Sequence, residues 1–262
     1  MKKGPSGEMP FLDHLEELRY RLLWSIGALV VCVVVAFSIV WQYDVIGWLS
    51  APIQPYLPEG KLVYTGPVDP FTIILKVAFG VGFIAALPII GYHVWSFLSP
   101  ALHRSEKKVM VPMLLGATVL FAIGVYLCVK WVLPASFSVL LTIQSAALEP
   151  MLTAREYFSF AVSVSLACGA VFQLPIVIVA LTMLGLVNPS LLTKFRRHAA
   201  VGSLLLAAII TPGDMFLTTV MIGVPLYALY EISIVLSWFV YRAKLKRARA
   251  REAAERIGGP EA

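Results

Sequence analysis

Residues 22–41 have the sequence LLWSIGALVVCVVVAFSIVW, which contains no charged side chain. The stretch begins directly after Arg21 and ends shortly before Asp44. A helix of about 20 apolar residues crosses a hydrocarbon core of about 30 Å. The segment therefore predicts a transmembrane helix, and we looked for further membrane-spanning stretches in the rest of the chain.

The remainder of the chain repeats this pattern. Of its residues 59% are hydrophobic and 14% are charged, and the mean hydropathy is +0.84. A soluble domain has about 45–50% apolar and about 25% charged residues. Further apolar stretches that could cross a membrane lie at residues 71–97, 110–133, 157–187, 199–211 and 216–241. We therefore expect an all-α integral membrane protein with six transmembrane helices.

Two of these helices are expected to be short. The 199–211 stretch is well below the length that a bilayer requires. The last stretch is equally short if Glu231 marks its inner boundary. A short hairpin predicts local thinning of the bilayer or a hydrated dent around these two helices.

The distribution of Lys and Arg gives the orientation. They cluster before the first stretch, between the second and third, between the fourth and fifth, and after the sixth. The opposite side carries only Lys61, Lys130 and Arg155. Positive residues gather on the cytoplasmic side, so both termini are expected there. We expect the chain to consist of a membrane domain over residues 1–241 and a basic cytoplasmic tail over residues 242–262. The net charge of +6 is explained by this topology and by anionic lipids, without a nucleic-acid partner.

An acidic pair stands out on the predicted cytoplasmic face. Residues 11–21 have the sequence FLDHLEELRYR, an amphipathic helix pattern expected at the interface. His14, Glu17 and Arg21 share one face, and Glu17 and Arg21 are spaced for an ion pair. The segment could be a solvated lead-in helix. Alternatively, Glu17 and Glu106 form a patch that binds a cationic ligand, best one with guanidinium groups.

Other polar residues lie inside or beside the predicted spans. Gln173, followed by Pro175, could hydrogen-bond to a neighbouring helix or contact something that enters the bundle. Glu231 is a functional candidate, although its carboxylate could also reach the inner interface. Asp214 precedes the sixth stretch, where it could cap the helix.

Signs of catalysis are missing from the sequence. It contains no GxSxG, HExxH or Walker motif and no paired intramembrane aspartates. The three cysteines show no metal-ligand spacing, so we expect no enzyme activity, no metal site and no cofactor. A secondary transporter or a scaffold for other membrane subunits stays open from the residues alone.

Several short motifs, in a fixed order along the chain, are similar to those of a known protein family. They are HLEELR at 14–19, SAP at 50–52, VWSF at 94–97, SPAL at 99–102 followed by Glu106, FQLP at 172–175 and TPGD at 211–214. With them the chain resembles the TatC family, the multi-spanning subunit of the twin-arginine protein translocase. The resemblance implies a concave, glove-like bundle with both ends in the cytoplasm of a bacterium or archaeon. It also implies short fifth and sixth helices.

The resemblance also implies a function. The chain would bind the twin-arginine signal peptides of folded precursors and nucleate export driven by the proton gradient across the cytoplasmic membrane. Glu17 and Glu106 would bind the arginines, with Arg19 and Phe97 in the same site, and Pro52 would shape the outer cap. Asp214 and the last two helices would contact single-span TatA/TatB-type subunits, within a complex that holds several copies of the chain.

Two positions depart from the family pattern. Gln173 stands where many members have Glu, and Thr218 stands where some have Gln. A neutral amide at position 173 weakens any mechanism that needs a titratable group there.

Overall fold

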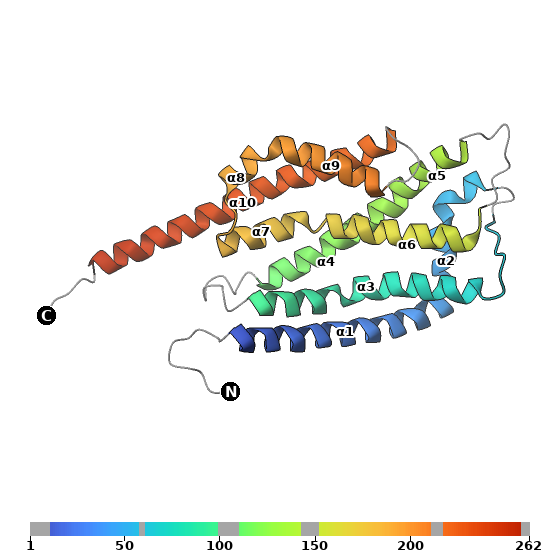
Figure 1. The fold of residues 1–262 in the computed structure, drawn as a ribbon, viewed down its shortest axis with the longest axis horizontal. Coiled ribbons are helices and arrows are strands. Elements are labelled where there is room, and N and C mark those ends of the chain that lie inside the picture. Colours follow the sequence, from blue (N-terminus) through green and yellow to red (C-terminus); the bar gives the residue numbers. More distant parts are fainter. Residues whose placement is uncertain (1–10, 58–60, 99–109, 143–151, 211–216, 258–262) are drawn as a thin grey trace.

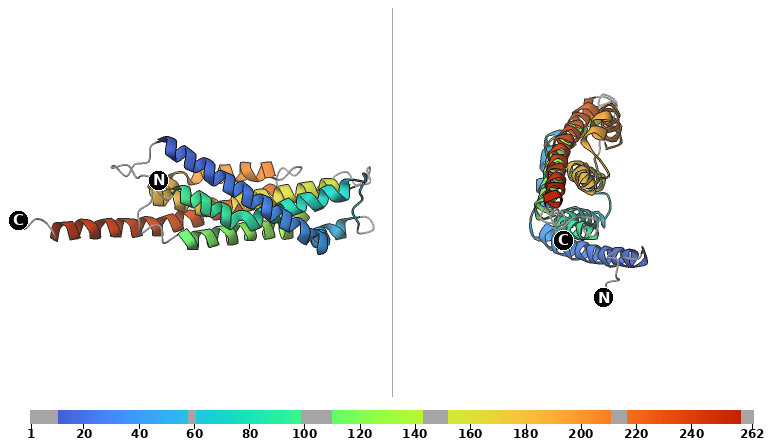
Figure 2. Two further views of the ribbon diagram at one scale, coloured as in Figure 1. Left: turned by 90° about the horizontal axis from the view of Figure 1, so that it is seen from below. Right: turned by 90° about the vertical axis from the view of Figure 1, so that its left-hand side faces the viewer.

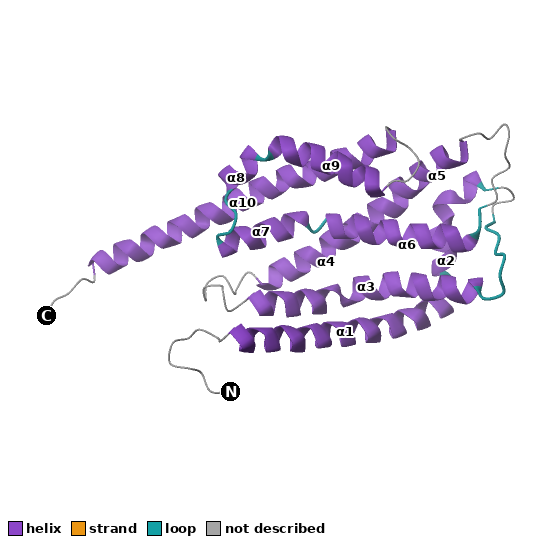
Figure 3. Ribbon diagram, in the orientation of Figure 1, coloured by secondary structure: helices purple, strands orange, loops and turns teal. Residues whose placement is uncertain are grey.

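The computed structural model describes residues 11–57, 61–98, 110–142, 152–210 and 217–257. Almost all of them are helical, as Figure 3 shows, and the only extended pairing among them is the isolated bridge between Val63 and Thr153. The helices are α1 (Phe11–Gln42), α2 (Val45–Ser50), η1 (Ala51–Tyr56), α3 (Asp69–Leu98), α4 (Met110–Leu127), η5 (Cys128–Val132), α5 (Leu133–Thr142), α6 (Ala154–Val171), α7 (Leu174–Leu184), α8 (Pro189–Lys194), α9 (Arg196–Ile210) and α10 (Leu217–Ile257). The expected all-α fold is confirmed.

Five stretches of the described chain are long and apolar enough to cross a membrane. They are His14–Gln42, Asp69–Phe97, Val111–Leu140, Ala154–Leu184 and Ile222–Lys246. They coincide with the first, second, third, fourth and sixth stretches expected from the sequence. The protein is therefore a multi-pass membrane protein.

The fifth expected stretch is the helix α9, which has 15 residues. At 1.5 Å per residue its length is about 22 Å, shorter than a hydrocarbon core of about 30 Å. It packs against α10, as the hairpin interpretation requires (Figure 1). A sixth crossing with both termini in the cytoplasm stays a prediction.

Two helices extend beyond their expected ends. The third span passes residue 133 and continues to Thr142, through the π-helical turn η5. Pro134 has no N–H to donate to the carbonyl one turn earlier, and its ring would clash there in a regular α-helix. The wider turn, in which the Leu133 N–H reaches the Cys128 carbonyl, avoids this clash.

The last helix is the second difference. α10 has 41 residues and runs without interruption past Glu231 and past the expected boundary at residue 241 to Ile257. The helix itself is therefore not short, and residues 242–257 continue it. A short membrane-crossing part of α10 stays a prediction.

The helices are arranged along an arc, with α1 and α3 at one side and α9 and α10 at the other (Figure 2, right). α1 and α3 run antiparallel along each other (Figure 1). We call the end where α1 begins, α3 ends and α10 projects the basic end of the bundle. The opposite end, with α2 and η1, is the cap end.

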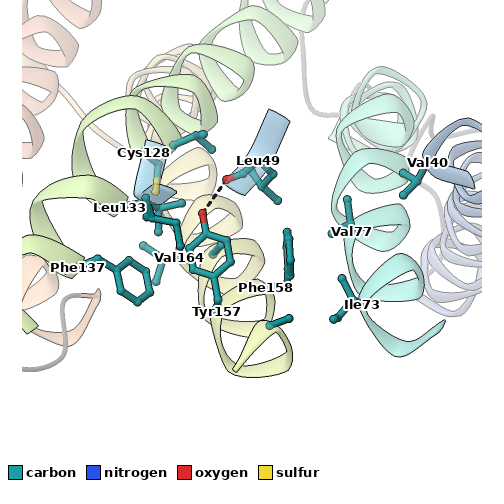
Figure 4. Close-up of a cluster of buried hydrophobic side chains, with 14 of the residues drawn as sticks. Val40, Leu49, Ile73, Val77, Cys128, Leu133, Phe137, Tyr157, Phe158 and Val164 are labelled. Atoms are coloured by element: carbon teal, nitrogen blue, oxygen red, sulfur yellow. Dashed lines mark hydrogen bonds between the residues drawn. The ribbon is translucent and has the colours of Figure 1, made fainter. Parts of the chain in front are cut away.

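The principal core lies toward the cap end. Tyr157 and Phe158 of α6 are fully buried against Leu133 and Ile53, the latter from η1. The Tyr157 hydroxyl donates to the Leu49 carbonyl over 2.7 Å (Figure 4). Pro52, the expected cap residue, lies in the first turn of η1, directly before the buried Ile53. The cap is thus fastened to the bundle by apolar burial and one buried hydrogen bond.

Candidate functional site

The first turns of α1 meet the last turns of α3 at the basic end. The His14 ring stacks on the Phe97 ring, with the centroids 4.3 Å apart and the planes 13° from parallel. Because the two helices are antiparallel, residues far apart in sequence come together here. Aromatic stacking of this kind contributes about 0.5–1.5 kcal/mol beyond the burial of area. Phe97, expected in the site, is therefore held next to the helix turn that carries Glu17.

Glu17 makes the ion pair that its spacing predicts. Its Oε1 accepts from the Arg21 Nε at 2.9 Å, and the Arg21 Nη2 also contacts Oε1. The other oxygen, Oε2, lies 4.0 Å from the His14 Nδ1. His14, Glu17 and Arg21 thus form one connected face of α1, which confirms the predicted shared face.

Buried polar atoms at the basic end lack partners within the described part of the chain. They are Glu17 Oε2, His93 Nδ1 and Trp95 Nε1. A buried polar atom without a hydrogen bond destabilises a protein by about 1–3 kcal/mol, more when it is charged. The Glu17 carboxylate therefore has an unfilled capacity to accept a hydrogen bond.

The remaining residues of the expected signal site differ in what the structure says of them. The Arg19 side chain is exposed. It lies two residues from Glu17, hence on a different side of α1. Glu106 lies outside the described residues. The expected interfacial helix over residues 11–21 is the start of α1 itself and not a separate element.

Gln173 bonds two helices together. α6 ends at Val171 and α7 begins at Leu174, so the fourth span is interrupted where Pro175 lacks a donor. At this break the Gln173 Nε2 donates to the Ala117 carbonyl of α4 at 2.9 Å. Gln173 is expected either to hydrogen-bond to a neighbouring helix or to contact something that enters the bundle. The contact with Ala117 is of the first kind.

Glu231 also has partners from its surroundings. Its Oε2 accepts from the Arg196 Nη2 at 2.9 Å, and its Oε1 accepts from the Tyr227 hydroxyl at 2.8 Å. The pair joins the start of α9 to the middle of α10. Asp214 lies outside the described residues, and Thr218 is helical in α10 but its side chain is not described. With Gln173 and Glu231 both engaged between helices, the transporter interpretation has no free polar group at either position.

Sequence reasoning missed two features. The first is the contact of His14 with Phe97, which depends on how α1 and α3 pair and has no local signal. The second is Asp69, which is 4% exposed and accepts from the backbone N–H of Thr65 at 3.2 Å and of Gly66 at 2.8 Å. The Arg155 guanidinium lies 3.5 Å from the same carboxylate. The sequence signal was an Asp before Pro70 at the start of a helix.

The described residues contain no candidate metal site. No three of their His, Cys, Asp or Glu side chains lie close enough to bind one ion. What the basic end offers is a carboxylate beside an aromatic stack, which suits the recognition of a cationic group.

Comparison with known proteins gives a consistent result. The family model described as Sec-independent protein translocase protein (TatC) matches residues 13–225. The Sec-independent protein translocase protein TatC of Aquifex aeolicus (strain VF5) is 37% identical over 245 residues, which cover 92% of this chain and 100% of that protein. The corresponding protein of Escherichia coli (strain K12) is 33% identical over 231 residues, 88% of either chain.

Solved structures are similar as well. The crystal structure of the twin arginine translocase receptor TatC is 37% identical in sequence and superposes with a TM-score of 0.72. The match covers 87% of this chain and 99% of that chain. A second crystal structure of that receptor, in the detergent DDM, gives a TM-score of 0.74.

Proposed function

This chain belongs to the TatC family of Sec-independent protein translocase proteins, and on that premise we propose that it is the receptor subunit of a twin-arginine translocase. It binds the twin-arginine signal peptide of a folded precursor and nucleates export driven by the proton gradient. It is a transport component and not an enzyme.

The observation that carries the proposal is the environment of Glu17. One carboxylate oxygen is held by Arg21, and the other is buried with no donor among the described residues. A guanidinium group from the signal would supply the missing donor to Oε2 in a charge-assisted hydrogen bond, and a fork across both oxygens where it displaces Arg21 from Oε1. Such hydrogen bonds contribute about 1.5–3 kcal/mol each. A signal with two lysines would bind more weakly, since an ammonium group cannot form the fork.

A second carboxylate completes the site. Arg21 already compensates the charge of Glu17, so two incoming arginines need a further acidic group. Glu106 is that group in the proposal, and the stacked Phe97 borders the same site. The exposed Arg19 lies on another side of α1, where it could contact only a part of the signal that extends around the helix. The His14–Phe97 contact supports this arrangement because it fixes the start of α1 against the end of α3, the segment that precedes Glu106 in the chain.

The partner subunits are proposed to bind at the opposite side of the arc, where α9 and α10 lie. The α9–α10 hairpin contacts single-span TatA/TatB-type subunits, together with Asp214, which lies between the two helices in the sequence, and Thr218, which lies in the first turn of α10. The ion pair between Glu231 and Arg196 holds α10 to α9 and so supports that surface, whereas Gln173 bonds to Ala117 of α4 and not to the hairpin. Several copies of the chain assemble in one complex in the bacterial cytoplasmic membrane, with both termini in the cytoplasm.

The test is export in cells that carry Glu17→Gln, Glu106→Gln or both, with a folded reporter behind a twin-arginine signal. We expect each single change to lower export and the double change to abolish it, because an amide keeps the shape but loses the charge. Glu16→Gln is the matched control, since the Glu16 side chain is exposed next to Glu17 on α1. Unchanged export in the double variant would defeat the proposal.

A further inference from the structure

Residues of α8 and α10 line an open groove. These two helices meet near the basic end, apart from the start of α1 that carries Glu17 (Figure 1). Its volume is about 640 Å³. This is within the range of about 300–1,000 Å³ that small-molecule sites occupy. The residues that line it are Pro189, Ser190, Thr193, Ile234, Val235, Trp238, Phe239, Tyr241, Arg242 and Leu245.

The lining has two chemically distinct parts. Most of it is an apolar wall from α10, which includes Ile234, Val235 and Phe239. The polar part consists of the α8 hydroxyls and the guanidinium group of Arg242. No carboxylate occurs among these lining residues. The nearest one along α10 is Glu231, and its charge is compensated by Arg196.

Arg242 is held in place for binding an anion. Its Cζ lies 3.5 Å from the centroid of the Trp238 ring, a cation–π contact that fixes the plane of the guanidinium group. Stacking uses the face of the group and leaves its N–H edge free for two parallel hydrogen bonds. The neighbouring Lys244 is engaged elsewhere, because its Nζ donates to the Met183 carbonyl at 2.8 Å. Among the described side chains, Arg242 is thus the cation that lines the groove.

The groove also lies where a membrane span meets water. The apolar stretch Ile222–Lys246 ends here, with Trp238 and Tyr241 followed by Arg242, Lys244 and Lys246. Aromatic residues followed by cations are typical of a membrane interface. Basic pockets between helices at the cytoplasmic interface bind the head groups of anionic lipids.

We propose that this groove is a binding site for one anionic phospholipid. An acyl chain lies along Ile234, Val235 and Phe239, and the phosphate accepts hydrogen bonds from Arg242. A zwitterionic lipid fits the apolar wall equally well, but its ammonium group meets the positive potential of this end of α10. The site therefore discriminates by head-group charge.

The experiment uses the full-length chain in detergent, equilibrated with equal amounts of phosphatidylglycerol and phosphatidylcholine. Native mass spectrometry counts the lipids retained. We expect preferential retention of one phosphatidylglycerol, and a loss of about tenfold in that retention in Arg242→Gln, as one charge-assisted contact is removed. Arg249→Gln is the matched control, because Arg249 is exposed on the same helix and does not line the groove.

A second variant tests the apolar wall. Val235 is 53% exposed and lines the groove, so Val235→Trp should fill the space and displace the lipid without removing any charge. Size-exclusion chromatography verifies that each variant is folded. Equal retention of the two lipids by the unmodified chain would overturn the proposal. So would retention of phosphatidylglycerol that neither Arg242→Gln nor Val235→Trp lowers.

Discussion

Glu17 is held at the start of α1 by contacts within its helix and between helices. Arg21, one turn later on the same helix, binds one oxygen of the carboxylate. The His14 ring, one turn earlier, stacks on Phe97 and so fastens this part of α1 to α3. The position of the Glu17 carboxylate therefore depends on both helices.

His14 is expected to position the start of α1. In His14→Ala the stack is lost, and we expect the affinity for a twin-arginine signal peptide to fall about 2- to 10-fold. His14→Phe keeps a ring against Phe97 and should retain most of the affinity. Binding of a fluorescent signal peptide to the chain in nanodiscs measures both.

The control for this series is Tyr20→Ala, because Tyr20 is an exposed ring on α1 that contacts Trp24 and lies away from Phe97. Equal losses in His14→Ala and His14→Phe would contradict a positioning role for the ring, and would indicate that the imidazole nitrogen matters instead.

Only part of this site can be predicted from the sequence. The pairing of Glu17 with Arg21 follows from a separation of four residues on a helix. The stacking of His14 on Phe97 has no local signal, because it depends on the register between α1 and α3. The burial of Glu17 Oε2 likewise depends on tertiary packing and not on the local sequence.

At the scale of the helix, α1 and α3 approach each other closely at Gly82. A Cβ built at this position would lie 2.6 Å from the Val33 Cα, a backbone atom that cannot move aside without shifting the helix. Small residues allow such close packing between membrane helices. This contact fixes the register that brings His14 to Phe97.

Gly82→Ala should therefore separate the two helices. We expect a loss of about 1–3 kcal/mol of stability, the usual effect of overpacking, seen as a lower thermal unfolding midpoint in detergent. Gly27→Ala is the matched control, because nothing lies within 4 Å of a Cβ added there. An equally stable Gly82→Ala chain would show that the close approach of α1 and α3 is not required.

Helix ends were predicted less well than helix positions. Apolar length locates the spans, but it predicts an end of the third span at residue 133, because the π-helical turn that carries the helix past Pro134 has no signal in the sequence. The extension of α10 did have one. Residues 242–257 have the sequence RAKLKRARAREAAERI, which is rich in Ala, Arg, Lys and Glu and lacks Gly and Pro. These are strong helix formers, and they favour continuation of the helix to Ile257.

Across the whole molecule, the two ends of the bundle differ in character. The cap end holds the largest buried core, fastened by the Tyr157–Leu49 hydrogen bond. The basic end carries the Glu17 oxygen that has no hydrogen-bond donor among the described residues, and the groove with Arg242. In the proposed orientation the cap end is the outer one and the basic end faces the cytoplasm, as a receptor for cytoplasmic precursors requires.

This arrangement requires both termini to be cytoplasmic. With Cys32, Cys128 and Cys168 replaced by Ala, we introduce Lys61→Cys near the cap end or Arg249→Cys in α10. A maleimide that cannot cross membranes should label position 61 in intact cells and position 249 only in inverted vesicles. Labelling of position 249 from outside intact cells would contradict the orientation, and with it a cytoplasmic site at Glu17.

The central claim is that the basic end recognises a twin-arginine signal, and photo-crosslinking in membranes tests it most directly. A photoreactive amino acid at position 17 or 106 is exposed to a precursor whose signal carries Arg-Arg or Lys-Lys. The account predicts adducts with the Arg-Arg precursor that fade with Lys-Lys, because only guanidinium groups can make the forked contact. No adduct with either precursor, in a chain shown to be inserted and folded, would contradict it.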